Sequence, residues 1–150
     1  MSQISLIVCI IIAMTLKIAP IPHTLIPFNP DWILLVIIAH TLAKPYQFSI
    51  GSAWLIGLFT DVLTSKILGQ YALAYAVCAY ILVTLHRQIR QFSMIHQCIL
   101  VLLLLLSAKA TIYITTSIQG VPRTDWTYWS TTIVGALIWP LIQRFLNKFR

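Results

Sequence analysis

Two opposite charges, Asp61 and Lys109, stand well inside apolar stretches of this 150-residue chain. A charged side chain among membrane-spanning apolar residues is costly, so by default it marks a functional site. Tyr113 and Thr116 follow Lys109 at i+4 and i+7, which places all three on one helical face. We predict a polar lining from these four residues, with a direct or water-bridged contact between Asp61 and Lys109. Alternatively, Asp61 caps the turn at Thr64–Ser65, and Lys109 bonds to Tyr113 or a neighbouring helix.

The other chemically reactive residues form no recognisable catalytic or metal-binding set. The chain has three acidic residues, no Gly-rich phosphate loop and no Ser-His-Asp arrangement. His86 and His96 have no acidic residue near them in the sequence, and Cys9, Cys78 and Cys98 lie in or beside apolar runs. Such cysteines behave as small buried hydrophobes. We therefore expect no enzymatic activity, no cofactor, no metal and no nucleic-acid binding.

The composition indicates a membrane protein. The chain is 59% hydrophobic and 9% charged, whereas a soluble domain carries roughly 25% charged residues. We predict an all-α, polytopic protein with a single transmembrane domain over residues 1–150, built as a six-helix bundle. The six apolar segments cover residues 4–21, 31–43, 48–63, 70–86, 98–118 and 130–145.

The second segment is too short to span a membrane by itself. Residues 31–43 give a helix of ~20 Å, against ~30 Å of hydrocarbon. The helix either continues through Pro45 with a kink, or the bilayer thins locally, or the segment is a re-entrant hairpin. At its start, Asn29 is the expected N-cap, Pro30 the first helical residue and Asp31 an acid in the first turn.

The third and fourth segments carry small residues at helical spacing, which lets helices approach closely. In the third segment the expected face holds Gly51, Trp54, Gly57 or Leu58, and Asp61. In the fourth segment the expected face holds Ala72, Ala76 and Ala79. Further on, a kink is expected at Trp139–Pro140, because proline removes one helical hydrogen bond.

Basic residues fix the predicted orientation. Six spans place both termini on one side of the membrane. The connectors and tail on that side hold Lys44, Arg87, Arg90, Arg144, Lys148 and Arg150, whereas the opposite connectors hold Lys66 and Arg123. Because cytoplasmic loops are enriched in Lys and Arg, we predict that both termini are cytoplasmic.

Several short motifs occur in order along nearly the whole chain. They are FNPDWILL at 28–35, GLFTD at 57–61, LG at 68–69 followed by YALA at 71–74, and WP at 139–140. Together they resemble the rod shape-determining protein MreD family of the bacterial inner membrane. The matching positions are Pro30, Gly57, Asp61, Gly69, Trp139 and Pro140. The resemblance implies structural or interfacial roles for them, and close relatives carry an acid where this chain has Lys109.

The resemblance implies a scaffold of the bacterial elongation complex. Such a protein associates with MreC, a bitopic membrane protein, and helps couple MreB filaments to peptidoglycan synthesis by RodA and its transpeptidase partner. The implied fold is similar to that of the substrate-binding subunits of energy-coupling-factor vitamin transporters. The alternative function is a small-molecule- or lipid-binding subunit, which the polar lining of Asp61, Lys109, Tyr113 and Thr116 favours.

Overall fold

A computed structural model describes residues 3–25, 28–65, 67–120 and 126–148. This part of the chain is all-helical, as predicted. The six helices are α1 (Gln3–Ile18), α2 (Trp32–Ala43), α3 (Ile50–Leu63), α4 (Gln70–Gln91), α5 (Met94–Ile118) and α6 (Trp126–Lys148). Two of them, α4 and α5, are long and apolar enough to cross a membrane, while α1, α2 and α3 are shorter apolar helices.

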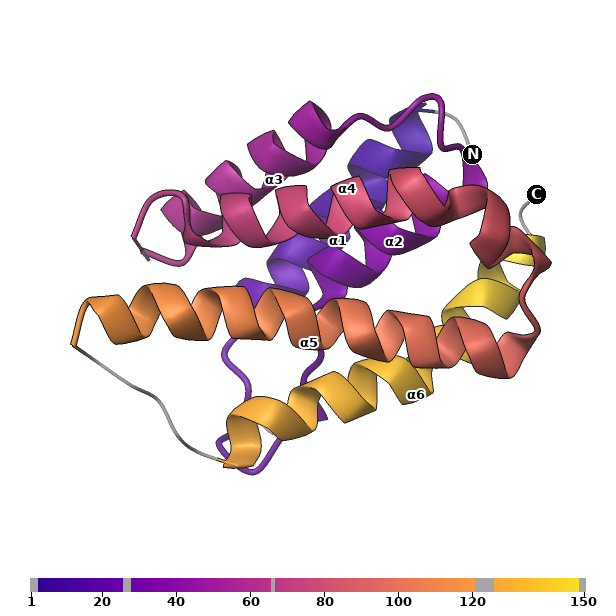
Figure 1. The fold of residues 1–150 in the computed structure, drawn as a ribbon. Helices are drawn as coiled ribbons and strands as arrows, with labels where there is room; N and C mark the ends of the chain where they lie inside the picture. The colour runs from indigo at the N-terminus through magenta and orange to yellow at the C-terminus, as the bar shows by residue number, and fades with distance from the viewer. Residues whose placement is uncertain (1–2, 26–27, 66, 121–125, 149–150) are drawn as a thin grey trace.

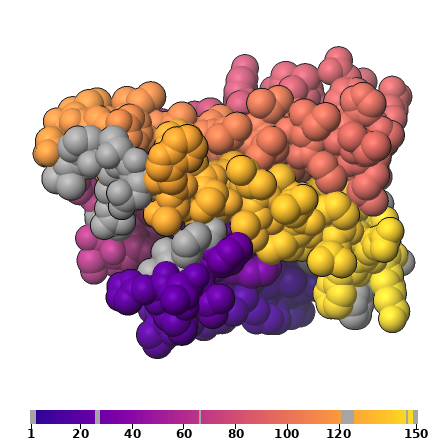
Figure 2. All heavy atoms as spheres, turned by 90° about the horizontal axis from the view of Figure 1, so that it is seen from below, coloured from indigo at the N-terminus to yellow at the C-terminus, as the bar shows by residue number. Residues whose placement is uncertain are grey.

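Successive helices run in alternating directions (Figure 1). The beginning of α1, the turn between α4 and α5, and the end of α6 therefore lie at the same end of the molecule (Figure 1). Helix α2 contacts α1, α4 and α6, and helix α4 contacts α2, α3 and α5, so these two helices form the centre. Figure 2 shows α6 lying between α5 and the N-terminal part of the chain.

Helix α2 begins two residues later than the sequence suggested. Its N-cap is Asp31, whose carboxylate accepts the backbone N–H of Leu34 at 3.5 Å. Asn29 instead accepts a 2.9 Å hydrogen bond from the indole N–H of Trp32. The prediction that Asn29 is the N-cap was wrong. The side-chain oxygen of Asn29 accepts the indole N–H of Trp32, and Asp31 caps the helix in its place.

Helix α2 ends at Ala43, where the sequence placed the end of the segment, and does not continue through Pro45. The N–H of Lys44 closes the last turn on the carbonyl of His40 at 2.9 Å. A kinked extension through Pro45 is therefore excluded. Most of the helix is buried by its neighbours. A helix enclosed by other helices need not match the hydrocarbon thickness, since its ends remain inside protein.

The predicted polar connector between the fourth and fifth segments is almost entirely helical. Helix α4 extends to Gln91 and α5 begins at Met94, which leaves a turn at Phe92–Ser93. The side-chain amide of Gln97 donates to the carbonyl of Ile89 at 3.1 Å and more weakly to that of Phe92 at 3.4 Å. The carbonyl of Ile89 also accepts the backbone N–H of Phe92 at 3.2 Å. The Gln97 side chain thus ties the start of α5 to the end of α4, so a short turn suffices.

Helices α3 and α4 form a close hairpin. A Cβ atom at Gly57 would lie 2.4 Å from the Cα of Ala72, so only glycine allows this approach. The buried residues of α3 are Ala53, Gly57, Thr60 and Asp61. The predicted face was therefore only partly right: Trp54 is 47% exposed and Gly51 is also exposed, because α4 covers the side that carries Gly57.

Helix α6 packs through residues that the sequence motifs singled out. Trp139 is buried, and α6 continues through Pro140 to Lys148. A Cβ at Gly135 would lie 2.9 Å from Leu105 and 3.4 Å from Pro30, so α6 meets α5 and the segment before α2 at that point. Pro30 thus belongs to a three-way contact and lies before the first turn of α2.

Candidate functional site

Asp61 is a cap for the helix that follows it. Its carboxylate accepts backbone N–H bonds from Gly69 and Tyr71, both at 2.9 Å, and from Ala72 at 3.4 Å. The first N–H groups of a helix have no partner within the helix. Gly69 occupies the N-cap position of α4 with φ +99° and has no side chain to accept them. The carboxylate from α3 therefore supplies the acceptors.

This arrangement corrects both predicted environments of Asp61. The carboxylate is fully buried, so it does not face water. Thr64 donates its hydroxyl to the carbonyl of Thr60 at 2.7 Å and is not capped by Asp61. Within the described ranges the structure holds one ion pair, and it does not involve Asp61 or Lys109. The predicted direct contact between these two charges is not formed, because the start of α4 takes up the carboxylate.

Lys109 instead contacts helix α6. Its ammonium nitrogen lies 4.3 Å from the ring centroid of Tyr128, a cation–π geometry. The hydroxyl of Tyr128 donates to the backbone carbonyl of Lys109 at 3.0 Å. Of the two alternatives given for Lys109, the structure therefore shows contact with a neighbouring helix.

The ion pair that does form joins Lys17 and Asp31 at 3.5 Å, and sequence reasoning missed it. The Lys17 ammonium also donates to the hydroxyl of Tyr75 at 3.3 Å and lies 3.8 Å from the ring centroid of Tyr71. The Tyr75 hydroxyl is 3.1 Å from both carboxylate oxygens of Asp31. The sequence contained a signal for this pair. Lys17 lies in the last turn of α1 and Asp31 is the N-cap of α2, and in antiparallel neighbouring helices the end of one lies beside the start of the next.

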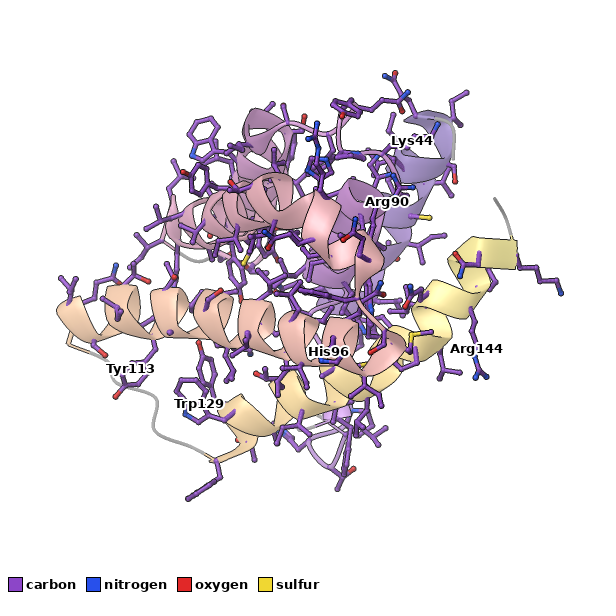
Figure 3. All side chains as sticks on the ribbon, turned by 45° about the vertical axis from the view of Figure 1, so that its right-hand side comes forward. Lys44, Arg90, His96, Tyr113, Trp129 and Arg144 are labelled. Atoms are coloured by element: carbon purple, nitrogen blue, oxygen red, sulfur yellow. The ribbon has the colours of Figure 1, made fainter. Side chains whose placement is uncertain are left out.

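A cavity of about 370 Å³ lies between α4, α5 and α6, at the end of the molecule that also holds the Lys17–Asp31 ion pair. Lys109, Tyr113 and Thr116 line it, together with Gln70 and Tyr71. Three of the four residues predicted to form a polar lining therefore share one cavity, and Asp61 is not among those lining it. Figure 3 shows Tyr113 and Trp129 facing one another between α5 and α6, with ring centroids 6.3 Å apart.

This cavity suits an anionic group. A smaller cavity of about 20 Å³ shares Tyr71, Lys109 and Tyr128 with its lining and is lined by Asp31 as well. Asp31 is already held by Lys17 and Tyr75, whereas the ammonium group of Lys109 lies against the ring of Tyr128 and forms no ion pair with any residue that the structure describes. The volume lies in the range of small-molecule sites, which is roughly 300–1,000 Å³. An ammonium group with nearby hydroxyls binds carboxylate or phosphate oxygens.

Metal binding has no support in the part of the chain that the structure describes, which holds no group of three or more His, Cys, Asp or Glu side chains. His96 bonds to the hydroxyl of Ser93 at 2.6 Å, and His86 bonds to the carbonyl of Val83 at 2.7 Å. Both histidines therefore have local partners on their own helix or turn.

These features are those of an all-helical protein with two helices able to cross a membrane, in which the charged groups of the described residues are held between helices by caps, rings and an ion pair. The chain belongs to the family of rod shape-determining protein MreD, whose family model matches residues 1–149. It is 30% identical over 144 residues to a rod shape-determining protein MreD of Haemophilus influenzae, a match that covers 93% of this chain and 86% of that protein.

Family membership places the chain in rod shape determination, as a member of the cell-shape complex in a membrane. No solved structure matches it. The expected likeness to energy-coupling-factor transporter subunits therefore has no support from a known structure. Gly57, Asp61 and Gly69, three of the positions on which the sequence resemblance rested, together make the α3–α4 hairpin, through a close approach, a cap and a positive φ.

Proposed function

We propose that this protein is a multi-pass scaffold of the bacterial inner membrane that holds the elongation complex together and has no catalytic activity. The observation that carries the proposal is the family match, which extends over residues 1–149 of this chain. In this proposal the chain forms one transmembrane domain in which all six helices cross the bilayer. The buried α2 crosses within the protein, enclosed by its neighbours.

The distribution of basic side chains supports the orientation. Lys44, Arg90 and Arg144 lie at one end of the molecule (Figure 3). This is the end where α1 begins and α6 ends (Figure 1). Since cytoplasmic ends of membrane helices are enriched in Lys and Arg, both termini are cytoplasmic in this proposal.

The proposed mechanism is helix packing against a partner. Helix α1 contacts α2 and leaves a large apolar face uncovered, with Ile4 74% and Ile7 and Ile11 each 55% exposed. This face and the Pro-rich connector that follows it dock the transmembrane helix and juxtamembrane region of an MreC-like bitopic protein. Through that partner the scaffold links MreB filaments to peptidoglycan synthesis by RodA and its transpeptidase.

Co-purification tests this proposal. The chain and an MreC-like partner are co-expressed, extracted in a mild detergent, and captured through a tag on the chain. Ile7→Trp and Ile11→Trp on α1 are expected to lose most of the partner, because a large side chain blocks close helix packing. Leu137→Trp and Leu141→Trp on α6, at comparably exposed positions, are the matched controls and should retain it.

Two results would count against the proposal. Background recovery of the partner with the unmodified chain contradicts the scaffold function itself. Loss of the partner with the α6 variants, but not with the α1 variants, contradicts the choice of docking face. Expression level and gel-filtration profile are compared for all four variants, so that unfolding is not mistaken for lost binding.

A second candidate function is a subunit that binds a small anionic molecule or a lipid. The cavity of about 370 Å³ beside Lys109 favours it. A thermal-shift screen of the purified chain with vitamins and anionic lipid precursors tests this function, because a ligand of the folded state raises the melting temperature. The shift should disappear in Lys109→Met. If no ligand shifts the melting temperature at saturating concentration, the binding function is contradicted and the scaffold function stands as the single proposal.

A further inference from the structure

A second cavity lies at the opposite end of the molecule from Lys109. Its volume is about 210 Å³, which corresponds to roughly seven waters at ~30 Å³ each. Its apolar wall comes from the last turns of α2 and from Ile89, and its polar wall from Arg90, Gln97, Trp139, Gln143 and Asn147. None of these residues lines the cavity beside Lys109.

The polar wall presents hydrogen-bonding atoms that none of the protein groups described by the structure satisfies. They are the indole N–H of Trp139 and the side-chain carbonyl oxygens of Gln97 and Gln143. Trp139 is 1% exposed and Gln97 is 8% exposed, so bulk water does not reach them freely. Buried polar groups in folded proteins are nearly always paired. These atoms therefore indicate a bound polar group.

The orientation of Gln97 determines what it offers. Its amide nitrogen is used by the carbonyls of Ile89 and Phe92, so its oxygen is left to act as an acceptor. Trp139 can only donate, and Arg90 adds a cation on the exposed side of the cavity. A ligand that matches this site carries a negative charge, for Arg90 and the indole N–H, and a separate hydrogen-bond donor, for the glutamine oxygen.

The position of the cavity limits the ligand class further. Ile89 and Arg90 end α4, and Gln97 begins α5, the two helices that are long and apolar enough to cross a membrane. Their shared turn therefore lies where hydrocarbon gives way to water. Lys44 and Arg144 lie at the same end of the molecule as Arg90 (Figure 3), and basic residues at this level attract anionic lipid headgroups.

We propose that this cavity binds the headgroup of a glycerophospholipid that carries a hydrogen-bond donor. The phosphate diester meets Arg90 and the indole N–H of Trp139, and the terminal amine or hydroxyl donates to Gln97 and Gln143. Ethanolamine and glycerol headgroups meet both requirements. Choline has the phosphate but no N–H or O–H donor. A peptide backbone offers donors and acceptors, but it has no negative charge for Arg90.

Native mass spectrometry of the full chain in detergent tests the proposal. The protein is mixed with equal amounts of phosphatidylethanolamine, phosphatidylglycerol or phosphatidylcholine, and retained lipid is counted. The first two should be retained about fivefold to tenfold better than the third, the effect expected for one or two buried hydrogen bonds. Equal retention of all three lipids would overturn the proposal and indicate a site filled by water or by a peptide segment.

Two variants assign the binding to this cavity. Gln143→Leu removes an acceptor for the headgroup donor, so it should abolish the preference over phosphatidylcholine or reduce it severalfold. Arg90→Gln removes the cation beside the phosphate, which all three lipids carry, so it should lower the retention of all three severalfold. Gln91→Leu and Arg87→Gln change exposed neighbours on α4 and are the matched controls. If the controls lose preference or retention as strongly, or if Gln143→Leu keeps the preference and Arg90→Gln keeps the retention, the cavity is not the site. Arg90→Gln alters only an exposed side chain, so it remains informative if Gln143→Leu unfolds.

Discussion

The carboxylate of Asp61 lies 2.9 Å from the backbone N–H of Gly69, eight residues later in the chain. Asp61, in the last turn of α3, therefore supplies hydrogen-bond acceptors to the first N–H groups of α4. The left-handed conformation of Gly69, with φ +99°, turns the chain so that two further N–H groups of α4 point at the same carboxylate. An acidic residue that looked like half of an intramembrane ion pair is instead the centre of a helical hairpin.

Asp61→Asn should destabilise the protein although it keeps the side-chain volume. The carboxylate accepts three N–H bonds through two oxygens, whereas an asparagine has one carbonyl oxygen and presents an NH₂ group to the remaining donors. The expected loss is about 1–3 kcal/mol, the cost of leaving buried donors unsatisfied. It is measured as a lower melting temperature in detergent.

Ser49→Ala is the matched control for that measurement. Ser49 caps α3 through a 3.2 Å bond from the N–H of Ser52, but it lies on the surface. Water replaces a lost cap there, so the loss should be about 0.5–1 kcal/mol. Equal losses in both variants would mean that burial of the Asp61 cap does not matter.

Double-mutant cycles should separate the observed ion pair from the one that the sequence suggested. Lys17→Met and Asp31→Asn should be non-additive, because their charged groups lie 3.5 Å apart and share Tyr75. Asp61→Asn and Lys109→Met should add within about 0.5 kcal/mol, since residues without shared partners usually do. Thermal stability of the four single and two double variants is the measurement. Strong coupling between Asp61 and Lys109 would contradict the structure.

Gly57→Ala should be one of the most damaging single substitutions in the chain. The added Cβ would lie within 2.4 to 2.8 Å of three backbone atoms of Tyr71 and Ala72, which no side-chain rotation can relieve. We expect a loss of at least about 1–3 kcal/mol, the usual cost of overpacking. Folded yield in detergent is the measurement.

Gly51→Ala in the same helix is the control for Gly57→Ala. Its nearest atom would be the Ser49 hydroxyl oxygen at an ordinary 3.7 Å. Alanine favours the helix over glycine by up to about 1 kcal/mol, so this variant should be neutral or stabilising. If the two alanine variants behave alike, the close approach of α3 and α4 is wrong.

The sequence was sufficient for the number and type of helices, because long apolar runs separated by Pro, Gly and polar residues leave little choice. The helix ends were harder to predict. The run from His86 to Gln97 is polar and suggested a loop, yet Gln97 bonds back to the end of α4 and leaves only a turn at Phe92–Ser93. A side-chain bond across a turn depends on tertiary geometry, which composition does not contain.

The partners of the charged residues could be predicted only in part. Helical spacing correctly grouped Lys109, Tyr113 and Thr116, because those three share one helix and one cavity. The predicted pairing of Asp61 with Lys109 across helices was wrong. Asp61 binds backbone N–H groups, which nearly every residue type carries, so the sequence does not mark its partners. Lys17 and Asp31 were within reach of prediction, because α1 and α2 follow one another in the chain and the two residues lie where one helix ends and the other begins.

The proposed orientation makes a direct prediction about two turns. Ser65 lies at the α3–α4 turn and Ser93 at the α4–α5 turn, and both are exposed. Because α4 is long and apolar enough to cross the membrane, these turns should lie on opposite sides of it, with Ser93 on the basic, cytoplasmic side.

In a variant whose three native cysteines are replaced by alanine, Ser65→Cys should react with a membrane-impermeant maleimide in spheroplasts. Ser93→Cys should react only after the cells are opened. Labelling of both cysteines in sealed spheroplasts would show that α4 does not cross the bilayer, and labelling of Ser93→Cys alone would invert the orientation and move the Lys109 cavity to the cytoplasmic side.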